Sequence, residues 1–200
     1  MLKKTRLFTP GPTPLQPAVQ EALARPILHH RTDEFRAVFK DCTAGLRRFL
    51  KTSDDVLILS CSGTGAMEAA LVNVLSPGEA MLALVAGNFG ERWAALGRAH
   101  GMVVDTLVAP PGEAVPPDLV GEYLDRHQEV RAVFVQLSES STGARHDVEG
   151  LAQLTRKRDV MLVVDAISGA GAMRLDTEAW GVYKGNPARK GEILSKELDF

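Results

Sequence analysis

Short apolar runs alternate with amphipathic stretches between residues 51 and 181. Apolar runs of four to eight residues between turn residues are typical of buried strands, and apolar residues spaced three and four apart are typical of helices. The pattern predicts strands at 56–59, 81–85, 102–108, 131–137 and 160–164. It predicts helices at 66–75, 117–127 and 147–158, and one ending near residue 100. This alternation favours an α/β fold with a mostly parallel sheet flanked by helices.

The residues before this region have a different pattern. A turn-rich segment at 8–14 is followed by two predicted helices, at about 15–25 and at 33–50. We therefore divide the chain into an N-terminal arm with helices, 1–50, an α/β domain, 51–181, and a tail, 182–200, where the hydrophobic pattern lapses.

The composition excludes several classes of protein. The chain has 200 residues, of which 45% are hydrophobic, and its 23 Lys and Arg against 25 Asp and Glu give a net charge of −2. This balance argues against a nucleic acid or an anionic membrane as partner. The sequence contains neither an apolar run of about 18 residues nor a signal-peptide pattern. With only two cysteines, Cys42 and Cys61, a reducing cytoplasm is the expected compartment.

Four polar or glycine-rich segments follow predicted strands. They are 62–65, 88–90, 139–143 and 165–168. In parallel sheets, ligands bind beyond the carboxyl ends of the strands, so these segments are expected to converge there. The first segment suits a phosphate, because glycines and hydroxyls precede a helix whose first N–H groups attract anions. Its spacing matches neither a P-loop nor a dinucleotide fingerprint, and a simple turn remains the alternative.

Two single residues in these segments can be interpreted in more than one way. Phe89, between two glycines, is either a core aromatic residue or a ring stacked on a planar ligand. Asp165 ends a run of five apolar residues and either caps a helix or pairs with a metal or a cationic ring nitrogen. The hydroxyl side chains of 139–143 can cap a helix, stabilise a turn or bind a ligand. His29 and His30 lack the Cys or acid spacing of a metal site, so no metal is expected.

Six motifs occur together in a fixed order, at 9–14, 30–35, 62–69, 87–92, 139–143 and 164–168. As a set they resemble the class V aminotransferases of fold type I, which use pyridoxal 5'-phosphate. The group with the most similar motifs contains the alanine–glyoxylate, serine–glyoxylate and serine–pyruvate aminotransferases. The resemblance covers residues 7 to about 181.

The resemblance implies a role for each matching residue. Ser62, Gly63 and Thr64 would bind the cofactor phosphate, Phe89 and Ile167 would cover the two faces of its ring, and Ser140 would lie beside the ring. Asp165 would keep the ring nitrogen protonated, which makes the ring an electron sink. Gly11 would line the substrate pocket. The implied reaction moves an amino group between alanine or serine and glyoxylate or pyruvate, in a homodimer whose subunits complete each other's sites.

The sequence departs from the family after Gly181. The family has there a Ser-Gln-Lys type motif whose lysine forms a Schiff base with the cofactor. This chain has no such motif, and Lys190, one residue from the expected position, is the candidate; it can equally be an exposed tail residue. The family's arginine for the substrate carboxylate has no counterpart here. We therefore expect a truncated or frame-shifted product with a foreign tail.

Three alternatives stay open at this point. One is another class V enzyme, such as a lyase or a cysteine desulfurase, which would need a reactive cysteine. Another is a cofactor-binding remnant without catalysis. The third, a nucleotide-binding protein, is disfavoured by the glycine spacing.

Overall fold

A computed structural model describes residues 7–182, and its contacts divide the chain into two units between Leu46 and Arg47. The first unit contains helix α1 (Pro17–Leu23) and most of α2 (Asp33–Leu50), which confirms both helices predicted there. Proline in the first turn of α1 presets the helical backbone angle. In α2, acidic residues occupy the first turn and arginines the last, which complements the helix dipole.

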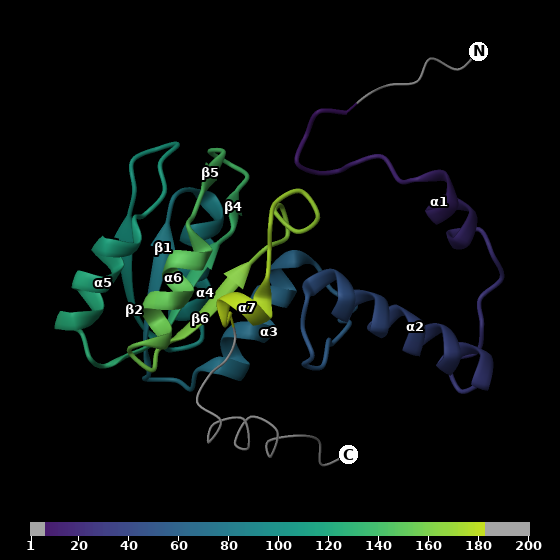
Figure 1. Cartoon of the computed structure of the whole chain (residues 1–200), viewed down its shortest axis with the longest axis horizontal. Helices are drawn as coiled ribbons and strands as arrows, with labels where there is room; N and C mark the ends of the chain where they lie inside the picture. Colours follow the sequence, from purple (N-terminus) through teal and green to yellow (C-terminus); the bar gives the residue numbers. More distant parts are fainter. Residues whose placement is uncertain (1–6, 183–200) are drawn as a thin grey trace. The chain divides into compact units, whose positions relative to one another are not determined.

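A four-stranded parallel sheet forms the centre of the second unit (Figure 1). Its strands are β1 (Ala80–Val85), β2 (Val103–Val108), β3 (Val130–Gln136) and β6 (Met161–Asp165), in the order β2-β1-β3-β6. Every neighbouring pair runs parallel. The predicted α/β class and four of the five predicted strands are thereby confirmed.

Helices cover both faces of the sheet. One face packs against α3 (Gly63–Val74) and α4 (Asn88–Ala99). The other packs against α5 (Pro117–Arg126), α6 (Val148–Arg156) and α7 (Thr177–Trp180). Alternate strand residues enter the two cores: Phe134 contacts Trp93 of α4 with ring centroids 4.8 Å apart, whereas Val133 packs with α5 and α6. Because both faces are buried, the central strands β1 and β3 are apolar along most of their length, whereas β2, at the edge, carries Asp105 and is only partly buried.

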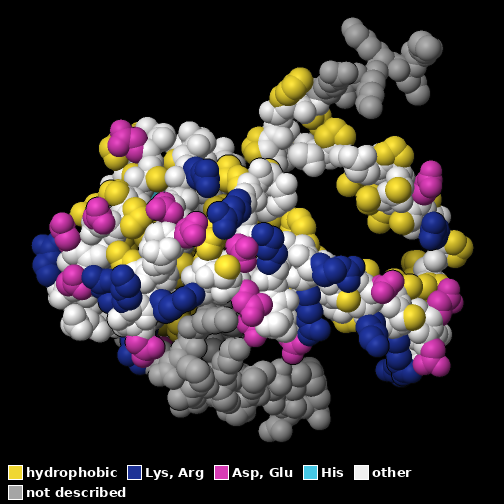
Figure 2. All heavy atoms as spheres, in the orientation of Figure 1, with side chains coloured by type: hydrophobic (Ala, Val, Ile, Leu, Met, Phe, Trp, Pro, Cys, Tyr) yellow, Lys and Arg dark blue, Asp and Glu magenta, His cyan; other side chains and the backbone are white. Residues whose placement is uncertain are grey.

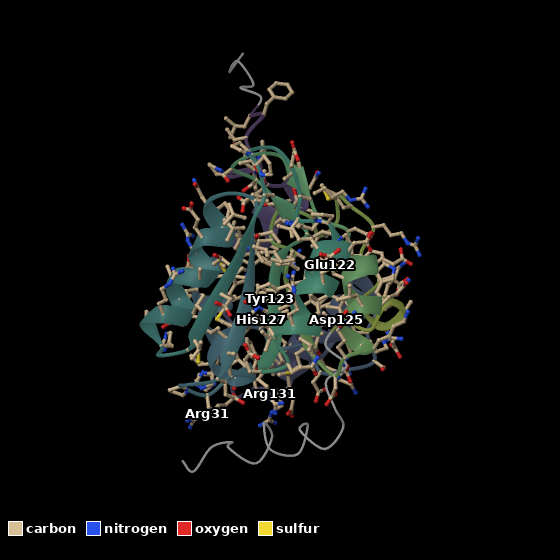
Figure 3. All side chains as sticks on the ribbon, turned by 90° about the vertical axis from the view of Figure 1, so that its left-hand side faces the viewer. Arg31, Glu122, Tyr123, Asp125, His127 and Arg131 are labelled. Atoms are coloured by element: carbon tan, nitrogen blue, oxygen red, sulfur yellow. The ribbon has the colours of Figure 1, made fainter. Side chains whose placement is uncertain are left out.

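Helix α5 carries Tyr123 and Asp125, which are labelled in Figure 3 and contact the elements beside it. Asp125 forms an ion pair with Arg158, just after α6, at 2.8 Å. The Tyr123 ring stacks on His127 with centroids 4.1 Å apart. Burial and then a hydrogen bond to Asp105 of β2 raise the pKa of Tyr123, so the phenol stays neutral. Asp125 and Tyr123 thus link α5 to Arg158 and to Asp105. Figure 2 shows acidic and basic side chains interspersed on the visible surface.

The prediction of a strand at 56–59 is wrong. The segment has no strand assignment, and the side chain of Leu57 is 82% exposed. An apolar run identifies residues that avoid water, but a strand also needs a neighbour to pair its N–H and C=O groups. No strand within residues 7–182 pairs with this segment. Within residues 7–182, no helix combines the length and the apolar character needed to cross a membrane.

Candidate functional site

Three parallel strands bring three of the four predicted segments to one edge of the sheet. Helix α4 follows β1, a short antiparallel hairpin of β4 (Ser138–Glu139) and β5 (Ala144–Arg145) follows β3, and the turn at 165–170 follows β6. Gln136, at the end of β3, is in register with Asp165, at the end of β6. The loops after these strands therefore share the carboxyl edge, as expected for a ligand site in such a sheet.

The start of α3 has the geometry of an anion-binding helix terminus. The helix begins at Gly63, three residues earlier than predicted, and Ser62 is its N-cap, accepting a hydrogen bond from the Gly65 N–H at 3.2 Å. Gly63 and Thr64 therefore lie in the first turn, where N–H groups have no partner within the helix. A Cβ on Gly65 would lie 2.9 Å from the Cβ of Cys61, so the tight turn requires a residue without one.

The start of α4 carries Phe89, which is half-buried. Gly90 lets the helix approach β1 closely, because a Cβ there would lie 2.6 Å from the Cα of Val85. The guanidinium of Arg92 lies over the Phe89 ring, 4.9 Å from its centroid. Arg92 also donates a hydrogen bond from Nη1 to Oγ1 of Thr64 at 2.8 Å. Arg92 thus joins the aromatic side chain to the start of α3.

The role of Arg92 was missed by sequence reasoning, although the residue lies within one of the six motifs. The available signal was its spacing of three from Phe89, which places both side chains on one helix face. Its partner Thr64 is 28 residues away, so the hydrogen bond itself left no local signal.

Glu139 and the turn after it lie against the start of α4. The buried carboxylate accepts hydrogen bonds from the N–H groups of Phe89 and Gly90, at 3.0 and 3.1 Å. Its other oxygen accepts from Oγ of Ser141 at 2.6 Å. Ser140, predicted to lie beside a ligand ring, occupies the same turn and is half-buried. The turn is therefore joined by hydrogen bonds to the main chain at Phe89.

Asp165 is a half-buried carboxyl at the end of β6. Burial raises its pKa, and the negative charge of Glu139 adds to the effect, whereas the Ile167 N–H and Arg92 act in the opposite direction. The Ile167 N–H donates to Oδ1 at 2.9 Å. The net effect of these groups disfavours the ionised carboxyl. A cationic ligand atom beside Asp165 would therefore stabilise its ionised form.

Ile167 brings the last predicted segment to the first. Its side chain is 62% exposed, and a Cβ on Gly63 would lie 2.6 Å from its Cδ1. The segments at 62–65 and 165–168 are therefore in contact across the sheet edge.

Two further polar side chains beneath this edge were not singled out in the sequence. Gln136 is fully buried, and neither of its side-chain polar atoms has a hydrogen-bond partner within residues 7–182; its Oε1 would lie 3.4 Å from a Cβ on Gly90. His146 is also buried, with Nδ1 2.9 Å from the Gln136 carbonyl oxygen, and burial lowers its pKa. The hairpin between them brings His146 back to the main chain of Gln136.

The other predicted site residues lie in the first unit or outside the described residues. Gly11 belongs to the first unit, and Lys190 lies outside the described residues, so their roles stay predictions. His29 and His30 are exposed, with stacked rings. Within residues 7–182 there is no group of three or more His, Cys, Asp or Glu arranged to bind a metal ion.

Comparison with known proteins gives the family. The class-V aminotransferase family model matches residues 15–184. The chain is 36% identical to a soluble hydrogenase 42 kDa subunit of Anabaena cylindrica, covering 98% of this chain and 52% of that protein. It is 33% identical to an L-aspartate–glyoxylate aminotransferase of Paracoccus denitrificans, covering 91% and 47%. The crystal structure of alanine–glyoxylate aminotransferase from Nostoc sp. matches with a TM-score of 0.85 and 31% identity, covering 91% and 48%.

The chain belongs to the class-V aminotransferases, a family of pyridoxal-phosphate-dependent enzymes, as the motifs predicted. It spans about half the length of the relatives it matches.

The raised pKa of Asp165 makes the stability of the chain depend on pH. In the unfolded chain this carboxyl ionises at its ordinary pKa, and in the folded chain at a higher pH. Ionisation therefore lowers the free energy of unfolding as pH rises through the window between the two values. We expect Asp165→Asn to be more stable than the parent above this window and to lose that advantage below it.

Urea unfolding at a series of pH values measures the difference. Glu113→Gln, at an exposed position, controls for the loss of one negative charge. A parent chain that is the more stable of the two at high pH would contradict the assignment.

Proposed function

We propose that this chain binds pyridoxal 5'-phosphate and serves amino transfer between a small amino acid, alanine or serine, and a 2-oxo acid, glyoxylate or pyruvate. The convergence of an anion-binding helix start, an aromatic ring and a half-buried carboxyl at one sheet edge carries the proposal. Relatives named as glyoxylate aminotransferases support a 2-oxo acid as the acceptor.

The start of α3 fits the phosphate. The hydroxyls of Ser62 and Thr64 and the N–H groups of the first turn, including that of Gly63, are donors suited to a dianion. Arg92 adds a positive charge through its contact with Thr64. Hydrogen bonds between charged partners are about twice as strong as neutral ones, so the phosphate would contribute much of the affinity.

The remaining residues fit the ring. Phe89 offers a flat surface for one face, Ile167 is an exposed apolar side chain for the other, and Ser140 would lie beside the ring. When bound, the cofactor supplies an electron sink that stabilises negative charge on the amino acid's α-carbon. The Asp165 carboxylate would keep the ring nitrogen protonated. The protonated ring would in turn stabilise the ionised form of Asp165 and so offset the effect of burial on its pKa.

Gly11 is proposed to line the substrate pocket. Lys190 remains the candidate for the lysine that bonds to the cofactor and moves a proton. The proposed compartment is the cytoplasm, in keeping with two free, exposed cysteines.

Removing the two hydroxyls at the start of α3 tests the phosphate position. We expect Ser62→Ala combined with Thr64→Ala to weaken pyridoxal 5'-phosphate binding at least about tenfold, since each lost hydrogen bond to a charged group costs about 1.5–3 kcal/mol. Affinity for pyridoxal, which lacks the phosphate, should stay unchanged. Equilibrium dialysis measures both ligands.

A matched control separates loss of the helix cap from loss of the ligand contact. Asp147 caps α6 by accepting from the Gly150 N–H, so Asp147→Ala removes a cap away from the site. The phosphate position is refuted if the double variant binds pyridoxal 5'-phosphate as the parent does, or loses both ligands equally.

A ¹⁵N-labelled amino acid tests the proposed amino transfer. The chain is incubated with pyridoxal 5'-phosphate, ¹⁵N-alanine and glyoxylate, and mass spectrometry measures ¹⁵N-glycine and pyruvate, which should form in equal amounts. Asp165→Asn should slow the reaction at least about tenfold, because its neutral side chain no longer favours a protonated ring nitrogen. Bound cofactor with no labelled glycine would contradict the catalytic proposal.

A homodimer is proposed on the family resemblance and on apolar residues left exposed in the first unit. Leu23 is 72% exposed and Ile27 98% exposed, values that favour a protein interface. Light scattering should give twice the chain mass of 21.6 kDa, and Leu23→Asp with Ile27→Asp should halve it. A parent chain with the mass of a monomer at micromolar concentration would overturn the dimer.

A further inference from the structure

Glu139 is a buried acid that none of the proposed cofactor contacts uses. It ends β4, three residues after the end of β3, and its relative exposure is 0%. Glutamate is almost never fully buried unless its charge is compensated. Within residues 7–182, the partners described for its carboxylate are main-chain N–H groups and one serine hydroxyl.

The two carboxylate oxygens bind two different loops. Oε2 accepts from the N–H groups of Phe89 and Gly90, in the first turn of α4. Oε1 accepts from the N–H and the hydroxyl of Ser141, at 3.2 and 2.6 Å. The negative charge also faces the positive end of the dipole of α4, a helix of 12 residues. The charge is therefore compensated by donors that a neutral side chain would satisfy poorly.

The same loops are joined by two more hydrogen bonds. The Ser141 hydroxyl oxygen accepts from the Asn88 N–H at 3.0 Å, and the Thr142 hydroxyl donates to the Ala86 carbonyl at 2.8 Å. Gly87 leaves room for the acid, because a Cβ there would lie 2.8 Å from the Cγ of Glu139. The main chain from 86 to 90 is thus fixed on the hairpin by its carboxylate and hydroxyls.

Fixing the main chain at Phe89 limits where its ring can lie. With the amide nitrogen bonded to Glu139, the remaining freedom of the ring lies in its side-chain torsions, and Arg92 stacks on the ring. Preorganised side chains bind ligands more tightly, because less conformational entropy is lost on binding.

We propose that Glu139 is a positioning residue for the cofactor: its ionised carboxylate holds the main chain at Phe89 and Gly90 and thereby sets the Phe89 ring against the pyridine ring. The inference rests on the proposed stacking of Phe89. It predicts that Glu139 affects binding of the ring and leaves binding of the phosphate alone unchanged.

Glu139→Gln is the discriminating variant. Glutamine has the same shape, but it replaces one acceptor oxygen with an NH₂ donor that would face N–H groups. Its matched partner is Phe89→Leu, which keeps an apolar side chain and removes the flat ring. The two single variants and the double variant form a cycle that measures their coupling.

The probes are pyridoxine 5'-phosphate, which has no aldehyde and forms no bond to a lysine, and inorganic phosphate. Calorimetry on the full chain measures both affinities. We expect each single variant to weaken pyridoxine 5'-phosphate binding by about two- to tenfold, the range for one lost aromatic contact. The double variant should bind as the single ones do, and phosphate affinity should match the parent in all four chains.

The outcomes separate the two claims. Unchanged pyridoxine 5'-phosphate affinity in Phe89→Leu overturns the proposed stacking itself. A loss in Phe89→Leu with none in Glu139→Gln, a fully additive double variant, or an equal loss of phosphate binding overturns the positioning role. Phosphate binding distinguishes positioning from general destabilisation, which would lower both affinities.

Ser141→Ala is the second variant, for use if Glu139→Gln does not fold. It removes the hydroxyl bonded to Glu139 and Asn88 while leaving the acid in place. We expect it to weaken pyridoxine 5'-phosphate binding in the parent and to have no further effect in Phe89→Leu. Unchanged affinity in the parent would overturn the proposal.

Discussion

A single buried carboxylate joins two loops that are 50 residues apart in the sequence. Burying the charge of Glu139 would be costly alone, and main-chain donors together with the dipole of α4 offset that cost. The carboxylate can reach these donors because β1 and β3 are adjacent and parallel, so the chain leaves both strands at one edge. This arrangement sets the position of the main chain at Phe89. Arg92 stacks on the Phe89 ring and donates a hydrogen bond to Thr64, at the start of α3.

The electrostatics of this edge suit a ligand with two opposite ends. The start of α3 and the guanidinium of Arg92 offer positive potential. Asp165 is a carboxyl whose ionisation is disfavoured by burial and by Glu139. A molecule with a phosphate at one end and a protonated ring nitrogen at the other would complement both, and pyridoxal 5'-phosphate has this chemistry. The family assignment and the local physics therefore agree.

The sequence predicted those parts of the fold that depend on local pattern. The strand predicted at 160–164 is an apolar run, as in a strand covered on both faces; the structure places it at Met161–Asp165, and Asp165 stood out in the sequence as the acid at its end. The run at 56–59 has the same local pattern but no strand to pair with in the described chain, which periodicity cannot detect. Glu139 and Arg92 were within motifs, yet the partners that join them to other loops, Gly90 for Glu139 and Thr64 for Arg92, are remote in sequence, so only the folded chain assigns these contacts.

We propose that the loops at this edge form one cofactor site, which a crystal structure of the chain with pyridoxal 5'-phosphate would test. We expect the phosphate on Ser62 and Thr64 at the start of α3, the ring against Phe89, and the ring nitrogen within hydrogen-bond distance of Asp165. A cofactor bound elsewhere, or one whose ring nitrogen points away from Asp165, would contradict it.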